Sequence, residues 1–279
     1  MSGRTAEPGP LALLDTWPVA HAAAVVVGRE GVRAAAGDVG QRLAWASVTK
    51  LLTALAVHVA CEEGTLALDQ PAGPSGATVA HLLAHASGLG LDDRHDPVAP
   101  PGARRTYSNA GYEVLADELA QAAEMPFATY LDEAVLAPLG MGATRLEGSP
   151  AAGAVGSTED LGRLATELLV PTLLAPEQAA LLGTVAFPGL DGVLPGYGAQ
   201  APNDWGLGAE VRGGKAPHWT APDAPPATFG HFGRAGGFCW VDPEAGVACA
   251  SLSDRTFGPW AKEAWPTLAS AVLAAPRPG

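Results

Sequence analysis

Strand-like segments occupy both ends of the chain, and helical segments occupy its middle. Residues 22–38 predict two short strands around a turn at residues 28–31, and after residue 183 four more strand-like pieces follow, at 205–213, 227–233, 236–242 and 246–254. Helical spacing predicts helices near 47–63, 78–88, 108–124, 126–138 and 157–170. We therefore expect an α+β fold in which strands from both ends pair in one antiparallel sheet.

Three parts of the chain follow from this pattern. Residues 1–72 and 184–279 are predicted to form the sheet region, flanked by terminal helices that include residues 258–275. Residues 73–183 are predicted to form an all-helical insertion. A cleft between the two regions is the expected functional site.

Charge and hydropathy exclude several classes of partner. The 279 residues carry a net charge of −13, which argues against nucleic acid and anionic membranes. Apolar runs such as residues 22–28 are too short to span a bilayer. The first 31 residues lack the pattern of a signal peptide, so we expect a cytoplasmic protein with reduced cysteines.

The three cysteines are Cys61, Cys239 and Cys249. If residues 236–254 form a hairpin that turns at 242–246, Cys239 and Cys249 lie opposite each other, which would permit a disulfide. We favour two buried thiols on one core face.

Ser47 and Lys50 lie three residues apart, where a long apolar helical run begins. The chain has only three lysines, and Lys50 is placed between Val48 and apolar residues. One helical turn brings the two side chains within reach, so a lysine of lowered pKa can activate the serine as a nucleophile. The alternative is an N-cap serine and a lysine that reaches solvent, and for Ser-x-x-Lys alone that interpretation is favoured.

Two further segments carry reactive side chains. Tyr107, Ser108 and Asn109 precede a predicted helix, and a tyrosine held near a lysine can act as a general base and then a general acid. His231 lies among glycines that allow a substrate to approach the backbone. Each segment also has an ordinary structural interpretation, as a packed tyrosine with a helix cap and as a half-buried histidine.

Taken together, these motifs resemble the serine β-lactamase and penicillin-binding-protein superfamily. The branch that is most similar contains class C β-lactamases, D-Ala-D-Ala carboxypeptidases and family VIII carboxylesterases. The S-x-x-K, Y-S-N and K-T-G-like elements occur in the expected order, and the sister class A pattern is S-x-x-K, S-D-N and K-T-G. The elements here are Ser47–Lys50, Tyr107–Asn109 and the segment His231, Phe232 and Gly233.

The resemblance implies a role for each of these residues. Ser47 is expected to become acylated, and Lys50 and Tyr107 to move its proton. Asn109 would orient the substrate, and His231 would replace the lysine of K-T-G beside Tyr107. The backbone N–H groups of Ser47 and Arg234 would form the oxyanion hole. The resemblance implies no metal and no cofactor.

One departure from the family pattern bears on the substrate. Phe232 takes the place of a hydroxyl residue that helps to hold the carboxylate of penicillins. We therefore expect an intracellular carboxylesterase or amidase that acts on a small ester, amide or lactam. The alternatives are a β-lactamase or D-Ala-D-Ala carboxypeptidase, an acyltransferase that uses the same acyl-enzyme, and a non-catalytic binding domain.

Overall fold

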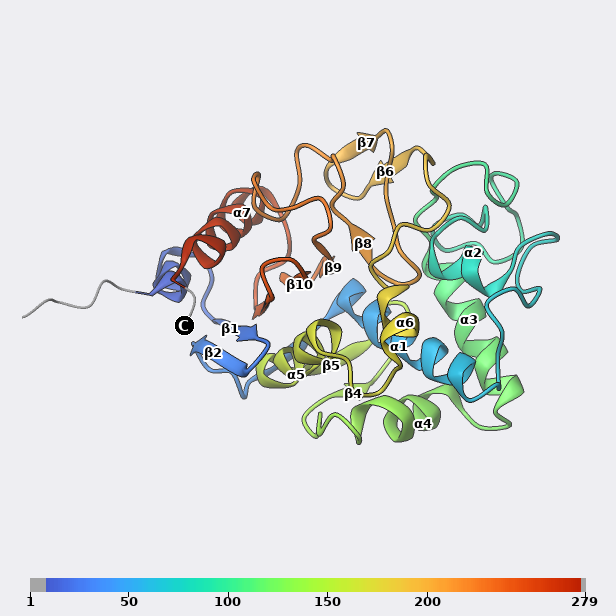
Figure 1. The fold of residues 1–279 in the computed structure, drawn as a ribbon, viewed down its shortest axis with the longest axis horizontal. Helices are drawn as coiled ribbons and strands as arrows, with labels where there is room; N and C mark the ends of the chain where they lie inside the picture. Colours follow the sequence, from blue (N-terminus) through green and yellow to red (C-terminus); the bar gives the residue numbers. More distant parts are fainter. Residues whose placement is uncertain (1–8, 277–279) are drawn as a thin grey trace, which may run out of the picture.

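A six-stranded antiparallel sheet forms the centre of the protein, whose computed structural model describes residues 9–276. The strand order is β2-β1-β11-β10-β9-β8 (Figure 1). The strands are β1 (Ala22–Gly28), β2 (Gly31–Ala36), β8 (Glu210–Val211), β9 (Phe229–Gly233), β10 (Gly237–Asp242) and β11 (Val247–Ser253).

The two ends of the chain meet in the middle of this sheet. β1 pairs with β11 along its whole length, from Ala22 opposite Ser253 to Gly28 opposite Val247. Both strands are almost entirely buried, as expected for near-continuous apolar strands covered on both faces. The predicted α+β fold, with one antiparallel sheet built from both ends, is confirmed.

Helices and short turns surround the sheet. The α-helices are α1 (Thr49–Glu62), α2 (Val79–Leu83), α3 (Asn109–Ala122), α4 (Phe127–Leu131), α5 (Thr158–Leu169), α6 (Pro176–Ala180) and α7 (Pro259–Ala274). The other helical segments are the 3-10 helices η1 (Pro10–Thr16) and η2 (Ala46–Val48) and the π-helix η3 (Asp132–Leu136). Small strands pair separately as β3 (Arg42–Ala44), β4 (Arg145–Leu146) and β5 (Ala154–Ser157), and as β6 (Gly192–Leu194) and β7 (Gly198–Gln200).

Each face of the sheet has its own apolar core. On one face, η1 and α7 bury an aromatic-rich cluster that includes Trp240 and Trp265. On the other, α1 and α5 cover the larger, mostly aliphatic cluster. Figure 1 shows α7 and α5 on opposite sides of the strands.

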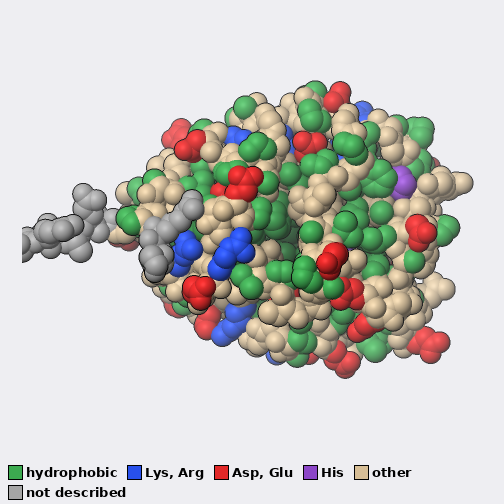
Figure 2. Space-filling model, viewed as in Figure 1, with side chains coloured by type: hydrophobic (Ala, Val, Ile, Leu, Met, Phe, Trp, Pro, Cys, Tyr) green, Lys and Arg blue, Asp and Glu red, His purple; other side chains and the backbone are tan. Residues whose placement is uncertain are grey.

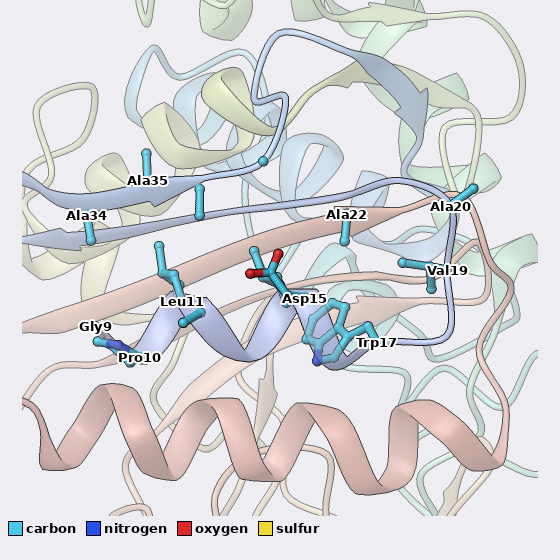
Figure 3. A pocket seen from close by; sticks show the side chains of 14 residues that line it. Gly9, Pro10, Leu11, Asp15, Trp17, Val19, Ala20, Ala22, Ala34 and Ala35 are labelled. Atoms are coloured by element: carbon cyan, nitrogen blue, oxygen red, sulfur yellow. The ribbon is translucent and has the colours of Figure 1, made fainter. Parts of the chain in front are cut away.

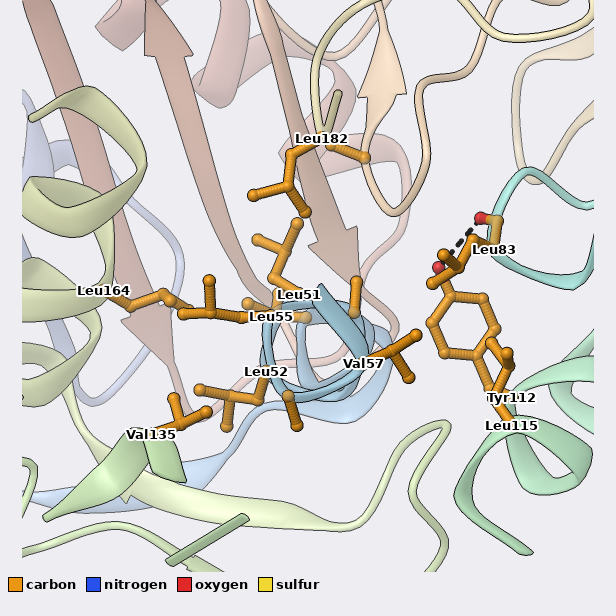
Figure 4. Packing of buried hydrophobic residues seen from close by; sticks show 14 of the residues in the cluster. Leu51, Leu52, Leu55, Val57, Leu83, Tyr112, Leu115, Val135, Leu164 and Leu182 are labelled. Carbon is orange, nitrogen blue, oxygen red and sulfur yellow. Dashed lines mark hydrogen bonds between the residues drawn. The ribbon is translucent and has the colours of Figure 1, made fainter. Parts of the chain in front are cut away.

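Helix α1 is buried on nearly every side, which explains why its sequence is apolar all round. Figure 4 shows Leu51, Leu55 and Val57 pointing from α1 toward different neighbours. The surrounding side chains in this view include Tyr112 of α3, whose hydroxyl donates to the carbonyl of Leu83 at 3.1 Å. Among the α-helices within residues 9–276, the helix that begins at the Ser47 motif is therefore the most enclosed.

The insertion predicted to be all helical is not. Residues 145–157 contribute β4 and β5, and α5 packs on the sheet instead of standing apart from it. A Cβ added at Gly162 of α5 would lie 3.1 Å from Val25 of β1, so the helix approaches the strand closely. Amphipathic spacing identifies α5 but does not say which surface its apolar face covers.

The predicted hairpin of β10 and β11 is present, but the proposed opposition of Cys239 and Cys249 is wrong. Cys239 pairs with Ala250, whereas Cys249 pairs with Trp240. A register offset of one residue places two side chains on opposite faces of a sheet. The two thiols accordingly lie in different cores, and both cysteines are free.

Within residues 9–276, no helix is long and apolar enough to cross a membrane. The first eight residues of the segment inspected for a signal peptide lie outside this range. On the face shown in Figure 2, acidic side chains are scattered widely and basic ones gather near the β1–β2 end.

Candidate active site

A cavity of about 390 Å³ brings the three sequence motifs together. Its lining includes Ser47 from η2, Tyr107 and Asn109 from the start of α3, and His231 from β9. The remaining wall is mostly apolar and is formed by Leu91, Leu194, Pro195, Gly196, Trp205, Glu210, Phe232, Arg234 and Phe257. All predicted site residues except the buried Lys50 and Gly233 therefore line one cavity.

A larger hollow of about 500 Å³ lies elsewhere, between η1 and the strands β1 and β2 (Figure 3). Its lining is dominated by alanines and by Leu11, Trp17 and Val19, with Asp15 as the one carboxylate. It lacks a nucleophile beside a base, so the 390 Å³ cavity is the candidate active site.

The backbone turns sharply at the nucleophile. Ser47 lies in the 3-10 turn η2, and Val48, not Ser47, occupies the cap position of α1; the predicted N-cap role of Ser47 is wrong. Ala46 has a φ of 45°, a left-handed conformation that L-residues with a Cβ rarely adopt. This turn presents Ser47 to the cavity instead of using its hydroxyl to cap the helix.

Gly233 allows β9 to pack directly on this turn. A Cβ at Gly233 would lie 2.2 Å from the carbonyl oxygen of Trp45. Arg234, which begins the turn after β9, lines the same cavity as Ser47, and the expected oxyanion hole would use the backbone N–H groups of these two residues. N–H groups at the start of a helical turn lack partners within the turn, which leaves that of Ser47 available.

Lys50 is fully buried, and within residues 9–276 no carboxylate forms a hydrogen bond or an ion pair with it. Its Nζ donates to Asn109 Oδ1 at 2.6 Å and to the carbonyl of Ala151 at 2.9 Å. Burial lowers the pKa of Lys50 to about 7, although the charges of Asp92 and Glu113 oppose the change. A neutral amine has two N–H groups and one lone pair. The two acceptors use both N–H groups and leave the lone pair for a proton.

Tyr107 lies against this amine, with its ring centroid 4.7 Å from Lys50 Nζ. Burial raises the pKa of the Tyr107 phenol, and the interaction with Ser47 offsets part of that increase. Burial therefore favours the phenol form of Tyr107 over a phenolate. Lys50 is the group that can lose its proton near neutral pH, and Tyr107 stays a phenol that can relay one.

His231 accepts a hydrogen bond from the phenol of Tyr107. Its Nδ1 lies 2.7 Å from the carbonyl of Phe232, and a carbonyl only accepts, so Nδ1 carries the hydrogen. Burial and the charge of Lys50 lower the pKa of His231 to about 3, which keeps the ring neutral. The free Nε2 then accepts from the Tyr107 hydroxyl, 3.5 Å away.

Asn109 is oriented by two partners of opposite character. Its Oδ1 accepts from Lys50, and its Nδ2 donates to Asp92 Oδ1 at 2.8 Å. Ser108 caps α3, in agreement with the structural interpretation of this segment: its Oγ accepts from the N–H of Gly111 at 2.9 Å. The cap fixes the start of α3 and so the positions of Tyr107 and Asn109.

Phe232 is part of an aromatic wall. Its ring centroid lies 5.0 Å from that of Phe257, 5.7 Å from Trp219 and 5.9 Å from Tyr197. The side chain is buried and lines the cavity. At the position where the K-T-G pattern has a hydroxyl, this site presents an apolar surface.

Sequence reasoning missed a buried ionic cluster beside the cavity. Glu210 of β8 accepts hydrogen bonds from Lys215, from His218 Nε2 at 2.9 Å and from Trp219 Nε1 at 3.0 Å. These partners lie 5 to 9 residues beyond Glu210. His85 and Trp205, which contact Tyr107, were also missed. A single glutamate or histidine among Gly- and Pro-rich residues gives no periodic signal.

Comparisons with known proteins agree with this geometry. The sequence profile of the β-lactamase family matches residues 18–273. A crystal structure of a β-lactamase from Mycobacterium bovis is 51% identical, with a TM-score of 0.93 and coverage of 95% of this chain and 98% of that one. EstCE1, a hydrolase with promiscuous acyltransferase activity, is 19% identical with a TM-score of 0.78, covers 95% and 96% of the two chains, and shows the fold alone.

A curated relative matches more locally. The D-alanyl-D-alanine-carboxypeptidase/endopeptidase AmpH of Escherichia coli is 30% identical over 141 residues, which cover 38% of this chain and 37% of the relative's length. The profile match spans nearly the whole chain and includes all three motifs of the cavity. The chain therefore belongs to the β-lactamase family of serine hydrolases.

Proposed function

We propose that this protein is a carboxylesterase or amidase that works through an acyl-Ser47 intermediate. One observation carries the proposal: Ser47 lies at a cavity one helical turn from a buried Lys50 whose pKa is lowered to about 7. Near neutral pH a large fraction of Lys50 is the free amine, so the site holds a base without needing a phenolate.

Acylation requires one proton to leave Ser47 and one to reach the leaving group. The Lys50 lone pair takes the Ser47 proton, directly or through the Tyr107 hydroxyl, while Oγ attacks the substrate carbonyl carbon. The backbone N–H groups of Ser47 and Arg234 stabilise the resulting oxyanion. Tyr107 then passes a proton to the departing alcohol or amine and is reprotonated from Lys50. Attack by water on the acyl-Ser47 ester, through the same groups, regenerates the enzyme.

The aromatic wall supports an ester or amide over a β-lactam. Recognition of a penicillin carboxylate needs polar donors, and Phe232 supplies none at that position. A buried charged group without its partner costs on the order of 1–3 kcal/mol or more. We therefore expect short-chain esters to react faster than penicillins or cephalosporins.

The test uses a fluorophosphonate label and two chromogenic substrates. Mass spectrometry should find one adduct, on the peptide that contains Ser47, and no adduct in Ser47→Ala. The kcat/KM for p-nitrophenyl acetate should exceed that for nitrocefin. Labelling that persists in Ser47→Ala would refute the nucleophile, and preference for nitrocefin would refute the substrate class.

The second candidate is β-lactam hydrolysis, which the 51% identity to the Mycobacterium bovis β-lactamase favours. Its acyl-enzyme step is the same, so the nitrocefin arm of the test decides between the two. Addition of an alcohol acceptor to the ester assay also measures acyl transfer, because a transferase would yield a new ester in place of the free acid.

A further inference from the structure

His85 lies directly behind Tyr107, at the centre of the rings that enclose it. It follows the short helix α2, is 1% exposed and has a φ of 54°, a left-handed conformation in which histidine is several-fold enriched among non-glycine residues. Its ring centroid lies 4.6 Å from Tyr107 and 4.6 Å, edge-on, from Trp205. A residue far from Tyr107 in sequence thus forms the back of its pocket.

Two hydrogen bonds tie His85 to both neighbours of Tyr107. The N–H of Thr106 donates to the backbone carbonyl of His85 at 2.8 Å. The N–H of Ser108 donates to His85 Nδ1 at 3.1 Å. Since Ser108 caps α3, its own N–H has no acceptor within the helix and depends on the imidazole. The backbone that carries Tyr107 is therefore held on both sides by one residue.

These contacts define the protonation state of His85. Nδ1 accepts a hydrogen bond, so the neutral ring carries its proton on Nε2. Burial keeps the pKa of His85 well below 6.5, and the positive charges of Lys50 and Arg105 act in the same direction. Within residues 9–276, Nε2 is buried without a hydrogen-bond partner.

We propose that His85 is a positioning residue that, through its Nδ1 acceptor, fixes the backbone of Tyr107 and aims the phenol at Ser47 and Lys50. This inference rests on the proposed function. Displacement of a reacting group by about 1 Å can cost 10²-fold in rate. The Tyr107 hydroxyl is at the end of a long side chain. A given rotation of the backbone therefore displaces this oxygen farther than the same rotation would displace the hydroxyl oxygen of Ser47.

Two substitutions separate the acceptor from the packing. His85→Asn keeps a side-chain acceptor and tolerates a positive φ, but it loses the ring. His85→Phe keeps the ring and loses the acceptor. His81→Asn, on the helix α2 that precedes His85, is the matched control, because His81 stacks on Phe187 instead of Tyr107.

The measurement is the rate of fluorophosphonate labelling of Ser47, together with kcat and KM for one p-nitrophenyl ester. We expect His85→Asn to stay within about threefold of the wild type even though its melting temperature falls. We expect His85→Phe to lose about 10²-fold in labelling rate and in kcat, with KM changed less than about twofold. His81→Asn should match the wild type.

The outcomes distinguish this inference from the function on which it rests. A wild-type protein that is neither labelled nor active on esters contradicts the proposed function. A labelled wild type with His85→Phe as reactive as His85→Asn contradicts the positioning role alone. If the labelling rate and kcat of the variants correlate with their melting temperatures, and not with the presence of a side-chain acceptor at position 85, the role of His85 is packing. If His85→Phe does not fold, a loss above tenfold in folded His85→Asn overturns the proposal.

Discussion

Two regions of the molecule each bury a lysine, but one lysine has a charged partner and the other has neutral partners. Lys215 forms an ion pair with Glu210, and both side chains are 1% exposed. Lys50 has two neutral acceptors, Asn109 Oδ1 and the carbonyl of Ala151. The same side chain is thus a member of a closed ionic cluster beside β8 and an amine without a direct counter-ion at the start of α1.

The difference lies in how each region compensates for desolvation. Burial lowers the pKa of both lysines, but the adjacent carboxylate opposes this strongly at Lys215. His218 and Lys215 in turn lower the pKa of Glu210 to about 2, although burial alone would raise it. At Lys50 the negative charges of Asp92 and then Glu113 oppose the pKa decrease that burial causes. An ion pair keeps a buried lysine charged and structural, whereas neutral partners allow it to exchange a proton.

The largest expected effect is on catalysis at Lys50. Lys50→Met should lower kcat/KM for an ester by about 10²–10⁴-fold, because it removes the general base. Lys50→Arg should fall nearly as far, since a guanidinium keeps the charge but does not release its proton near neutral pH. The measurement is steady-state hydrolysis of p-nitrophenyl acetate, with circular dichroism to verify folding. A near-active Lys50→Arg would show that Lys50 acts only as a charge.

At Lys215 the expected loss is in stability. Lys215→Met leaves the Glu210 carboxylate buried without its counter-ion and should lower the free energy of unfolding by about 3–5 kcal/mol. Urea unfolding followed by circular dichroism measures this change. Addition of Glu210→Gln should recover part of the loss, because the double variant no longer buries an unpaired charge. If Lys215→Met instead loses activity as Lys50→Met does, without loss of stability, the contrast between the two lysines is wrong.

The smallest effect is a shift in pH dependence. Since only neutral Lys50 accepts a proton, kcat/KM should fall as the pH drops through about 7. The negative charge of Asp92 favours the ammonium, so Asp92→Asn should lower the midpoint of this acid limb by less than about one unit. Asparagine keeps an oxygen that can accept the hydrogen bond from Asn109 Nδ2. Asp96→Asn on the same exposed loop is the control, and an unshifted or raised midpoint in Asp92→Asn would contradict the assignment of Lys50 as base.

Local sequence patterns were sufficient to predict most helices and strands and many residues of the candidate site. Alternation and apolar runs predicted the strands at both ends, and helical spacing predicted α1, α3 and α5. The separation of three residues between Ser47 and Lys50 places both within one turn whatever the rest of the fold does. The cap of α3 at Ser108 likewise depends on neighbours a few residues away.

Contacts between distant segments decided the chemistry. Burial lowers the pKa of Lys50 to about 7. The residues that bury it include Asn109 and Ala151, which are 59 and 101 positions away in the sequence. The sheet faces on which Cys239 and Cys249 lie depend on the pairing register of β10 and β11, which differs by one residue from the predicted register. His85 supports the backbone beside Tyr107 through a hydrogen bond from the N–H of Ser108 to His85 Nδ1, and these two residues are 23 positions apart. The sequence by itself determined which helices and strands form and which reactive side chains lie at their N-terminal ends, because both depend on short-range geometry. Only the tertiary structure decided protonation states and positioning partners, because desolvation and hydrogen bonding depend on which distant segments exclude water from a group.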